Sequence, residues 1–161
     1  MAVVIDADYK ENSKGMRSRW DAICSQLAKE GYDNLPRSPE AAGTVLELPA
    51  VRGRRPIRFG VWIMPNNQLE GMLEDFLAFL IPQDDKILPH VDRFLNGIPP
   101  EERLFTDIHL PKARIHSYLA VQKEPGKPLG LSITFRYLDA KREVVQPFLD
   151  WLTDVLIADG N

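Results

Sequence analysis

The stretch Phe59–Leu80, FGVWIMPNNQLEGMLEDFLAFL, decides how the rest of the sequence is interpreted. Its start, with Ile57 and Arg58, is a compact apolar run that is typical of a buried strand in an α/β sheet. The run breaks at Pro65-Asn66-Asn67. Apolar residues then return at helical spacing, at Met72, Leu73, Phe76, Leu77 and Leu80. We therefore predict a strand over 57–64, a polar turn, and a helix that Pro82 ends.

The remaining elements follow from similar patterns. Ala2–Ile5 is predicted to be a strand, and Asn12 or Ser13 is expected to cap a helix that runs to about residue 30. A strand over 44–48 is joined to the strand over 57–64 by the basic turn VRGRRP. Helices are predicted over 86–96, from 112 to about 122, and at the C-terminus. Residues 129–138, LGLSITFRYL, alternate like a strand and are also spaced like a helix. The order β-α-β-β followed by helices predicts an α/β fold.

Composition limits the classes of protein to consider. The 161 residues are 44% hydrophobic and 27% charged, with a net charge of −3, which is typical of one globular domain and gives no general reason to expect nucleic acid. No apolar run approaches a membrane span, and the start does not resemble a signal peptide. A single cysteine, Cys24, fits a reducing compartment, so we expect a cytoplasmic protein without membrane partners.

Two carboxylates follow the first strand. Asp6 and Asp8 point to the same side of an extended chain, so both can reach one hard cation. Ligands of open α/β sheets bind outside the carboxyl ends of the strands, where these residues are expected. Mg²⁺ held by one or two carboxylates, with Mn²⁺ able to replace it, is usual in phosphoryl chemistry. The alternative is that either aspartate only caps a turn.

Several blocks together resemble an uncharacterised family related to Toprim domains. They are VVIDAD, VWIMPNN, GMLEDFL, LPKARIHSYLAVQ, EPGKPLG and PFLDWL, and they extend over nearly all of the chain. Toprim domains occur in topoisomerases, primases and overcoming-lysogenization-defect nucleases, where acidic residues hold Mg²⁺. The resemblance implies a mostly parallel, Rossmann-type sheet with a helical C-terminal section, and a metal-dependent enzyme acting on nucleic acid or a relic of one. Haloacid-dehalogenase-type phosphatases also begin with Asp-x-Asp, but Tyr9-Lys10 departs from their continuation.

Two features depart from the Toprim pattern. The glutamate that Toprim domains carry well upstream of Asp-x-Asp has no counterpart, because only five residues precede Asp6. The fold is therefore expected to be a single domain over residues 1–161 that lacks the N-terminal part. Asn66 stands where the family block Met-Pro-Asp-Asn has an acid, and an amide oxygen holds a divalent cation less tightly. Loss of early strands would leave an uncovered sheet edge, which predicts a homo-oligomer.

Further candidate residues lie on the predicted turn and helices. Asn66 and Asn67 are expected at the same sheet edge as the aspartates, if the two strands are parallel. Glu70 and Glu74 share one flank of the helix, while Asp75 lies about 100° away, so Glu74 and Asp75 are not expected to bind one metal together. The resemblance to the family block Leu-Glu-Asp-Phe implies Glu74 as the third metal ligand. The alternative is that these acids only offset the helix dipole.

Basic residues supply candidate phosphate contacts. Lys112 and His116 are four residues apart on one predicted helix, so they share a face and are expected to contact phosphate or move a proton. The alternative is an exposed lysine and a packed histidine. The turn with Arg52, Arg54 and Arg55, followed by Arg58, could contact phosphates or be only solvated.

The sequence supports two functional hypotheses. The first is a Mg²⁺-dependent phosphoryl-transfer or nuclease-type site on nucleic acid or nucleotide phosphate. There, Asp6 and Asp8 hold metal with Glu74, Asn66 and Asn67 in support, while Lys112 and His116 contact phosphate. The second is a catalytically inactive interaction module that keeps the fold, which the missing glutamate and Asn66 favour.

Overall fold

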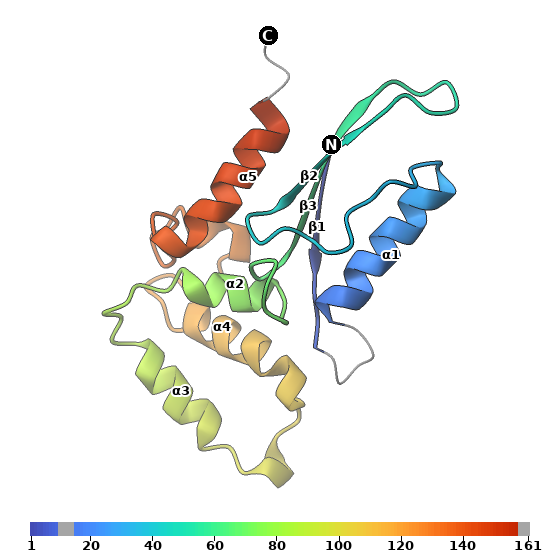
Figure 1. Ribbon diagram of the computed structural model, residues 1–161. Helices are drawn as coiled ribbons and strands as arrows, with labels where there is room; N and C mark the ends of the chain where they lie inside the picture. The colour runs from blue at the N-terminus through green and yellow to red at the C-terminus, as the bar shows by residue number, and fades with distance from the viewer. Residues whose placement is uncertain (10–14, 158–161) are drawn as a thin grey trace. The chain divides into compact units, whose positions relative to one another are not determined.

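The computed structural model describes residues 1–9 and 15–157 and shows a mixed α/β protein (Figure 1). The chain forms two compact units. The first comprises Met1–Phe76 and the stretch that begins at Val145, and the second comprises Leu77–Val144. The single domain expected for residues 1–161 stays a prediction. Among the described residues, no helix is long and apolar enough to cross a membrane.

The first unit is built on a three-stranded sheet with the order β1-β3-β2. β1 (Ala2–Asp6) pairs with β3 (Ile57–Met64) in parallel, and β2 (Thr44–Leu48) pairs with β3 in antiparallel. The predicted strands are confirmed, but the prediction of a mostly parallel sheet is wrong, because the sheet is mixed. The connection over residues 49–56 is too short for the crossover that a parallel pair needs, so β2 and β3 must be antiparallel.

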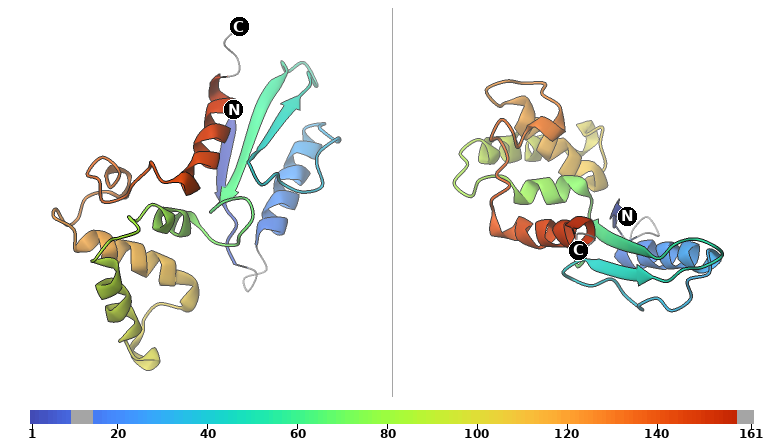
Figure 2. Two further views of the ribbon diagram at one scale, coloured as in Figure 1. Left: turned by 60° about the vertical axis from the view of Figure 1, so that its left-hand side comes forward. Right: turned by 90° about the horizontal axis from the view of Figure 1, so that it is seen from above.

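Two helices cover opposite faces of this sheet, as Figure 2 shows: α1 (Met16–Lys29) on one side and α5 (Gln146–Ile157) on the other. Alternation along β3 divides its side chains between them. Val61 and Ile63 form a core cluster with Trp20 of α1. Trp62 instead contacts α5, with ring centroids 5.1 Å from Phe148 and 5.5 Å from Trp151. The expected cap of α1 at Asn12 or Ser13 lies outside the described residues.

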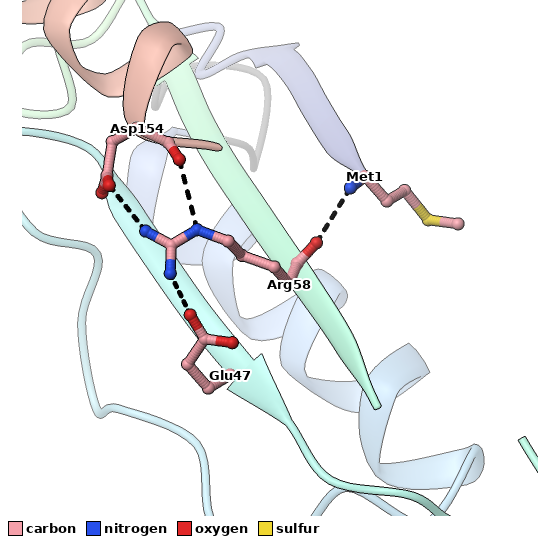
Figure 3. A network of polar contacts seen from close by, with 4 residues as sticks. All are labelled: Met1, Glu47, Arg58 and Asp154. Carbon is pink, nitrogen blue, oxygen red and sulfur yellow. Dashed lines mark hydrogen bonds and ion pairs between the residues drawn. The ribbon is translucent and has the colours of Figure 1, made fainter. Parts of the chain in front are cut away.

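The α5 helix lies very close to the sheet. A Cβ atom added at Gly60 would lie 2.4 Å from Val155 Cγ2, so only glycine leaves room for the helix here. The indole of Trp151 donates to Thr44 O at 3.1 Å, which ties α5 to β2. Figure 3 shows that Arg58 of β3 also holds α5, because its Nε donates to Asp154 O at 3.2 Å.

The second unit is helical. The chain enters it through α2 (Leu73–Phe79), and the unit contains α3 (Leu88–Asn96) and α4 (Leu110–Ala120). Arg114 of α4 forms a two-bond ion pair with Asp92 of α3, with N–O distances of 2.6 and 2.9 Å. The Tyr118 hydroxyl, on a side chain that is 1% exposed, donates to Asp85 Oδ2 at 2.9 Å. The bounds of α2, α3 and α4 confirm the three helices predicted for this region. Most of their ends differ from the prediction by one or two residues.

Residues 129–138 form neither of the two structures that their sequence fits. A short 3₁₀ helix, Leu129–Leu131, is followed by turns in which Arg136 has a φ of 60°. Ser132 and Leu138 are buried. The segment buries these two side chains without forming a strand or an α-helix. Neither the strand-like alternation nor the helical spacing of its apolar residues therefore predicts its structure. Other 3₁₀ helices are Pro100–Glu102, Asp107–His109 and Glu143–Val145.

Candidate functional site

The carboxyl ends of β1 and β3 meet at one edge of the sheet. In the parallel register Asp6 pairs with Met64, and Ala7 N donates to Met64 O at 3.2 Å. Asp6 and Asp8 therefore emerge beside the turn that follows β3. The expectation that Asn66 and Asn67 share this edge with the aspartates is confirmed.

Both asparagines of the turn use their amide oxygens to shape it. Asn67 Oδ1 accepts a hydrogen bond from Ile63 N at 2.7 Å, and Asn67 has a φ of 59°, which asparagine tolerates better than most residues. Asn66 Oδ1 accepts from Gln68 N at 3.2 Å and from Leu69 N at 2.9 Å. Within the described residues, the buried Nδ2 of Asn67 has no hydrogen-bond partner. The oxygens that were expected to support a metal are thus engaged in the turn.

The start of α2 is joined directly to the end of β1. Leu73 N, the first amide of the helix, donates to Asp6 Oδ1 at 2.8 Å, and Met72 N donates to Asp75 Oδ2 at 2.8 Å. The first amides of a helix lack intrahelical acceptors, so both carboxylates satisfy donors that would otherwise be unpaired. Asp6 therefore caps the distant helix α2, a role that neither interpretation of the sequence predicted, and this contact brings the start of α2 to the same sheet edge.

Asp75 also forms a contact that its sequence pattern did not predict. Its Oδ2 also accepts the Tyr9 hydroxyl at 2.9 Å. Burial, the hydrogen bond to Asp75 and the negative charges of Asp75 and Glu74 raise the pKa of the Tyr9 phenol above its ordinary value. Sequence reasoning missed Tyr9 and set Asp75 aside. The position of Asp75, three residues after the cap residue Met72, is the capping-box position and could have indicated this role.

Asp8 is held from two sides. Its backbone forms a bridge with Gly71, with Asp8 N donating to Gly71 O at 2.8 Å and Gly71 N to Asp8 O at 3.2 Å. Its carboxylate forms an ion pair with Arg19 of α1. The φ of 58° at Asp8 lies in the left-handed region, where aspartate is among the favoured non-glycine residues. Arg19 is a basic neighbour of the site that the sequence did not single out.

The edge is acidic, and Glu74 is its most buried carboxylate, at 8% exposure. Within the described ranges 1–9 and 15–157, no group of three or more His, Cys, Asp or Glu side chains is arranged to hold a metal ion. The donors nevertheless suit a hard cation, because Mg²⁺ is commonly bound through one or two carboxylates with water and phosphate oxygens. Asp6 and Asp8 supply two carboxylates at this edge.

A protein-family model matches nearly the whole chain. The model of the family described as "Protein of unknown function (DUF3226)" matches residues 1–157. The chain belongs to this family. No curated protein and no solved structure matches it.

The other residues singled out in this DUF3226 chain are on α4, before α2 and around the basic turn. Lys112 and His116 are on α4 of the second unit, on one exposed face of the helix. Glu70 lies in the segment between the β3 turn and α2. Three of the four arginines near the basic turn have contacts within the protein: Arg52 donates to Lys29 O at 3.1 Å, Arg54 pairs with Glu30 at 2.6 Å, and Arg58 pairs with Asp154 at 2.6 Å and with Glu47.

Proposed function

We propose that the sheet edge at Asp6 and Asp8 binds a divalent cation, Mg²⁺ or Mn²⁺, and serves phosphoryl transfer on nucleic acid or nucleotide phosphates. The observation that carries the proposal is the bond from Leu73 N to Asp6 Oδ1, at 2.8 Å. This bond joins the first turn of α2 to the end of β1, so the start of the helix that carries Glu74 meets the edge at which Asp6 and Asp8 lie. The resemblance to Toprim domains, which use acidic residues in this way, supports the same function.

The residues present have distinct roles in this proposal. Asp6 and Asp8 would hold the cation, with Glu74 as the third carboxylate, and Asn66 and Asn67 would fix the neighbouring turn. A bound Mg²⁺ would supply charge neutralisation at a phosphoryl group. Arg19 would hold the Asp8 carboxylate in place through their ion pair. Lys112 and His116 of the second unit are proposed as phosphate contacts in their own right.

A catalytically inactive interaction module is the second candidate. It is favoured by the contacts of Asp6 and Asp75, whose described hydrogen bonds go to the start of α2 and to Tyr9. It is also favoured by Asn66, which supplies no charge. In this case the edge would be a structural joint, and function would depend on a protein or nucleic acid partner. A cytoplasmic location, expected from the single Cys24, applies to both candidates.

Calorimetric titration of Mn²⁺ into metal-free protein distinguishes the two candidates. Asp6→Asn removes the charge but keeps an oxygen that accepts from Leu73 N, and Asp8→Asn keeps a residue that tolerates positive φ. Asp21→Asn is the matched control, because Asp21 is exposed on α1 and paired only with Arg17 among the described side chains. Saturable binding that is lost in the first two variants and kept in the third would support the metal site.

The same titration can refute the proposal. Equal heats in all four proteins, or no binding by the wild type, would overturn the metal site and leave the interaction module. If Mn²⁺ binds, cleavage of single-stranded and double-stranded DNA and RNA should be assayed with the wild type and Asp8→Asn. Cleavage by both proteins at equal rates would mean that the activity does not come from this edge.

We also propose that the chain self-associates through β1. The sheet order places β1 at an edge, and Val4 at its centre is 46% exposed. An exposed strand edge offers unpaired backbone groups to a second copy. Light scattering should give a mass above 18.3 kDa, the mass of one chain. A monomer at high protein concentration would contradict this proposal.

A further inference from the structure

A hollow of about 360 Å³ lies in the second unit, between α4 and the segment that follows it. Leu119 of α4 and the loop residues Pro128 and Leu129 give it apolar walls. His116 and Lys127 are the polar side chains of its lining. A mostly apolar hollow of this size with a few convergent polar groups is the usual form of a small-molecule site.

The ammonium group of Lys127 contacts two side chains of the second unit. Its Nζ lies 2.9 Å from Glu124 Oε2 and 4.8 Å from the centroid of the Phe135 ring. The Phe135 ring is itself stacked on Tyr137, with centroids 5.8 Å apart. The Lys127 ammonium has three N–H donors, so the ion pair with Glu124 leaves it able to donate to a second acceptor.

The local backbone explains why Lys127 and His116 line the same hollow. Gly126 has a φ of 78°, which side chains with a Cβ rarely adopt, and it forms the turn at which the chain reverses after α4. This reversal places Lys127, directly after the glycine, in the lining that His116 shares. An imidazole N–H and a lysine ammonium are both donors. The described lining residues include no acid, and the Glu124 carboxylate that pairs with Lys127 is outside the lining.

We propose that this hollow binds a phosphate group attached to an apolar or aromatic body. The phosphate would accept hydrogen bonds from His116 and Lys127, while Leu119, Pro128 and Leu129 contact the body. Charge-assisted hydrogen bonds to phosphate are among the stronger polar contacts, and the apolar walls favour an organic phosphate over inorganic phosphate. The inference does not depend on a metal at the sheet edge, because every group involved belongs to the second unit.

Calorimetric titration with phenyl phosphate in the presence of EDTA tests the proposal. Phenol, which lacks the phosphate, and inorganic phosphate, which lacks the ring, should bind more weakly. His116→Gln and Lys127→Met should each weaken phenyl phosphate binding about tenfold or more, the usual loss for one charged hydrogen bond. His109→Gln and Lys123→Met are the matched controls, since neither residue lines the hollow. They should bind within about twofold of the wild type. Circular dichroism should show unchanged helix content in all four variants.

Two results would overturn the proposal: no saturable binding by the wild type, or equal binding by all four variants. The Asp6→Asn protein should bind phenyl phosphate as the wild type does. Loss of Mn²⁺ binding with retained phenyl phosphate binding in that protein is therefore the outcome expected if both sites exist. Absence of Mn²⁺ binding in every protein, with phenyl phosphate binding intact, would refute only the metal site.

Discussion

Substituting Gly60 by alanine should destabilise the first unit through one steric conflict. Gly60 lies in β3, beneath α5. A Cβ atom at this position would lie 2.4 Å from Val155 Cγ2, 2.9 Å from Val155 Cγ1 and 3.0 Å from Trp151 Cζ2. Real Cβ atoms essentially never approach other atoms to less than 3.0 Å, so the helix or the strand must shift. The backbone φ of Gly60 is not in the left-handed region, so the effect would be steric alone.

The loss of stability depends on how easily Val155 and Trp151 can move away from the added Cβ atom. A valine in a helix strongly prefers one χ1 rotamer, so Val155 cannot swing both methyl groups away cheaply. Trp151 is restrained by its hydrogen bond to Thr44 O. Overpacking a core typically costs 1–3 kcal/mol, and these restraints put Gly60→Ala at about 2–3 kcal/mol of the free energy of unfolding. The matched control, Gly130→Ala, has nothing within 4 Å of its added Cβ and should change stability by less than about 0.5 kcal/mol.

Urea unfolding, monitored by tryptophan fluorescence, measures the stability of the first unit. All three tryptophans, Trp20, Trp62 and Trp151, lie in the first unit. Val155→Ala removes both clashing methyl groups, so the double variant should be more stable than the two single effects predict, by at least about 1 kcal/mol. Wild-type stability of Gly60→Ala would refute the close approach of α5, and strictly additive effects would refute Val155 as its cause.

Three further perturbations test other contacts. Asp6→Ala should destabilise the first unit by about 1 kcal/mol through loss of the cap on α2, whereas Asp6→Asn should cost less because its amide oxygen still accepts; equal losses in urea unfolding would refute a capping role. Tyr118→Phe should cost about 1–3 kcal/mol, measured by circular dichroism at 222 nm, because Asp85 loses the hydrogen bond that the Tyr118 hydroxyl donates; an unchanged midpoint would contradict this contact. The hydrogen bond from Arg114 lowers the pKa of Asp92 in the folded protein. This pair therefore stabilises the second unit at pH values above the unfolded-state pKa of Asp, which is about 4. The contribution is lost as the pH falls through the lower pKa of the folded state. Asp92→Asn should therefore lower the melting temperature at pH 7 and have a smaller effect at pH 2–3; a constant difference across that range would show that charge is not the cause.

The sequence alone predicted the elements whose stabilising contacts follow a simple period. The apolar run of β3 and the stripes of α2, α4 and α5 identify strand and helices, because one face of each must be buried. The position of Asp6 at the end of a strand was also predictable, as was its meeting with the turn at Asn66. Residues 129–138 could not be assigned, because turns and a 3₁₀ helix bury only Ser132 and Leu138 and have no period.

The tertiary structure determines which groups each polar side chain contacts. No local pattern shows that Asp6 caps a helix 67 residues later, or that Asp75 rather than Glu74 binds Tyr9. Nor does any pattern show that Lys127 would line one hollow with His116. These contacts arise between segments that are distant in sequence, and their geometry depends on the strand pairing and the turns that bring the segments together. The sequence by itself determined which residues form strands and helices, because burial is periodic within an element. Only the folded chain determined which polar groups meet, because that depends on how the elements pack.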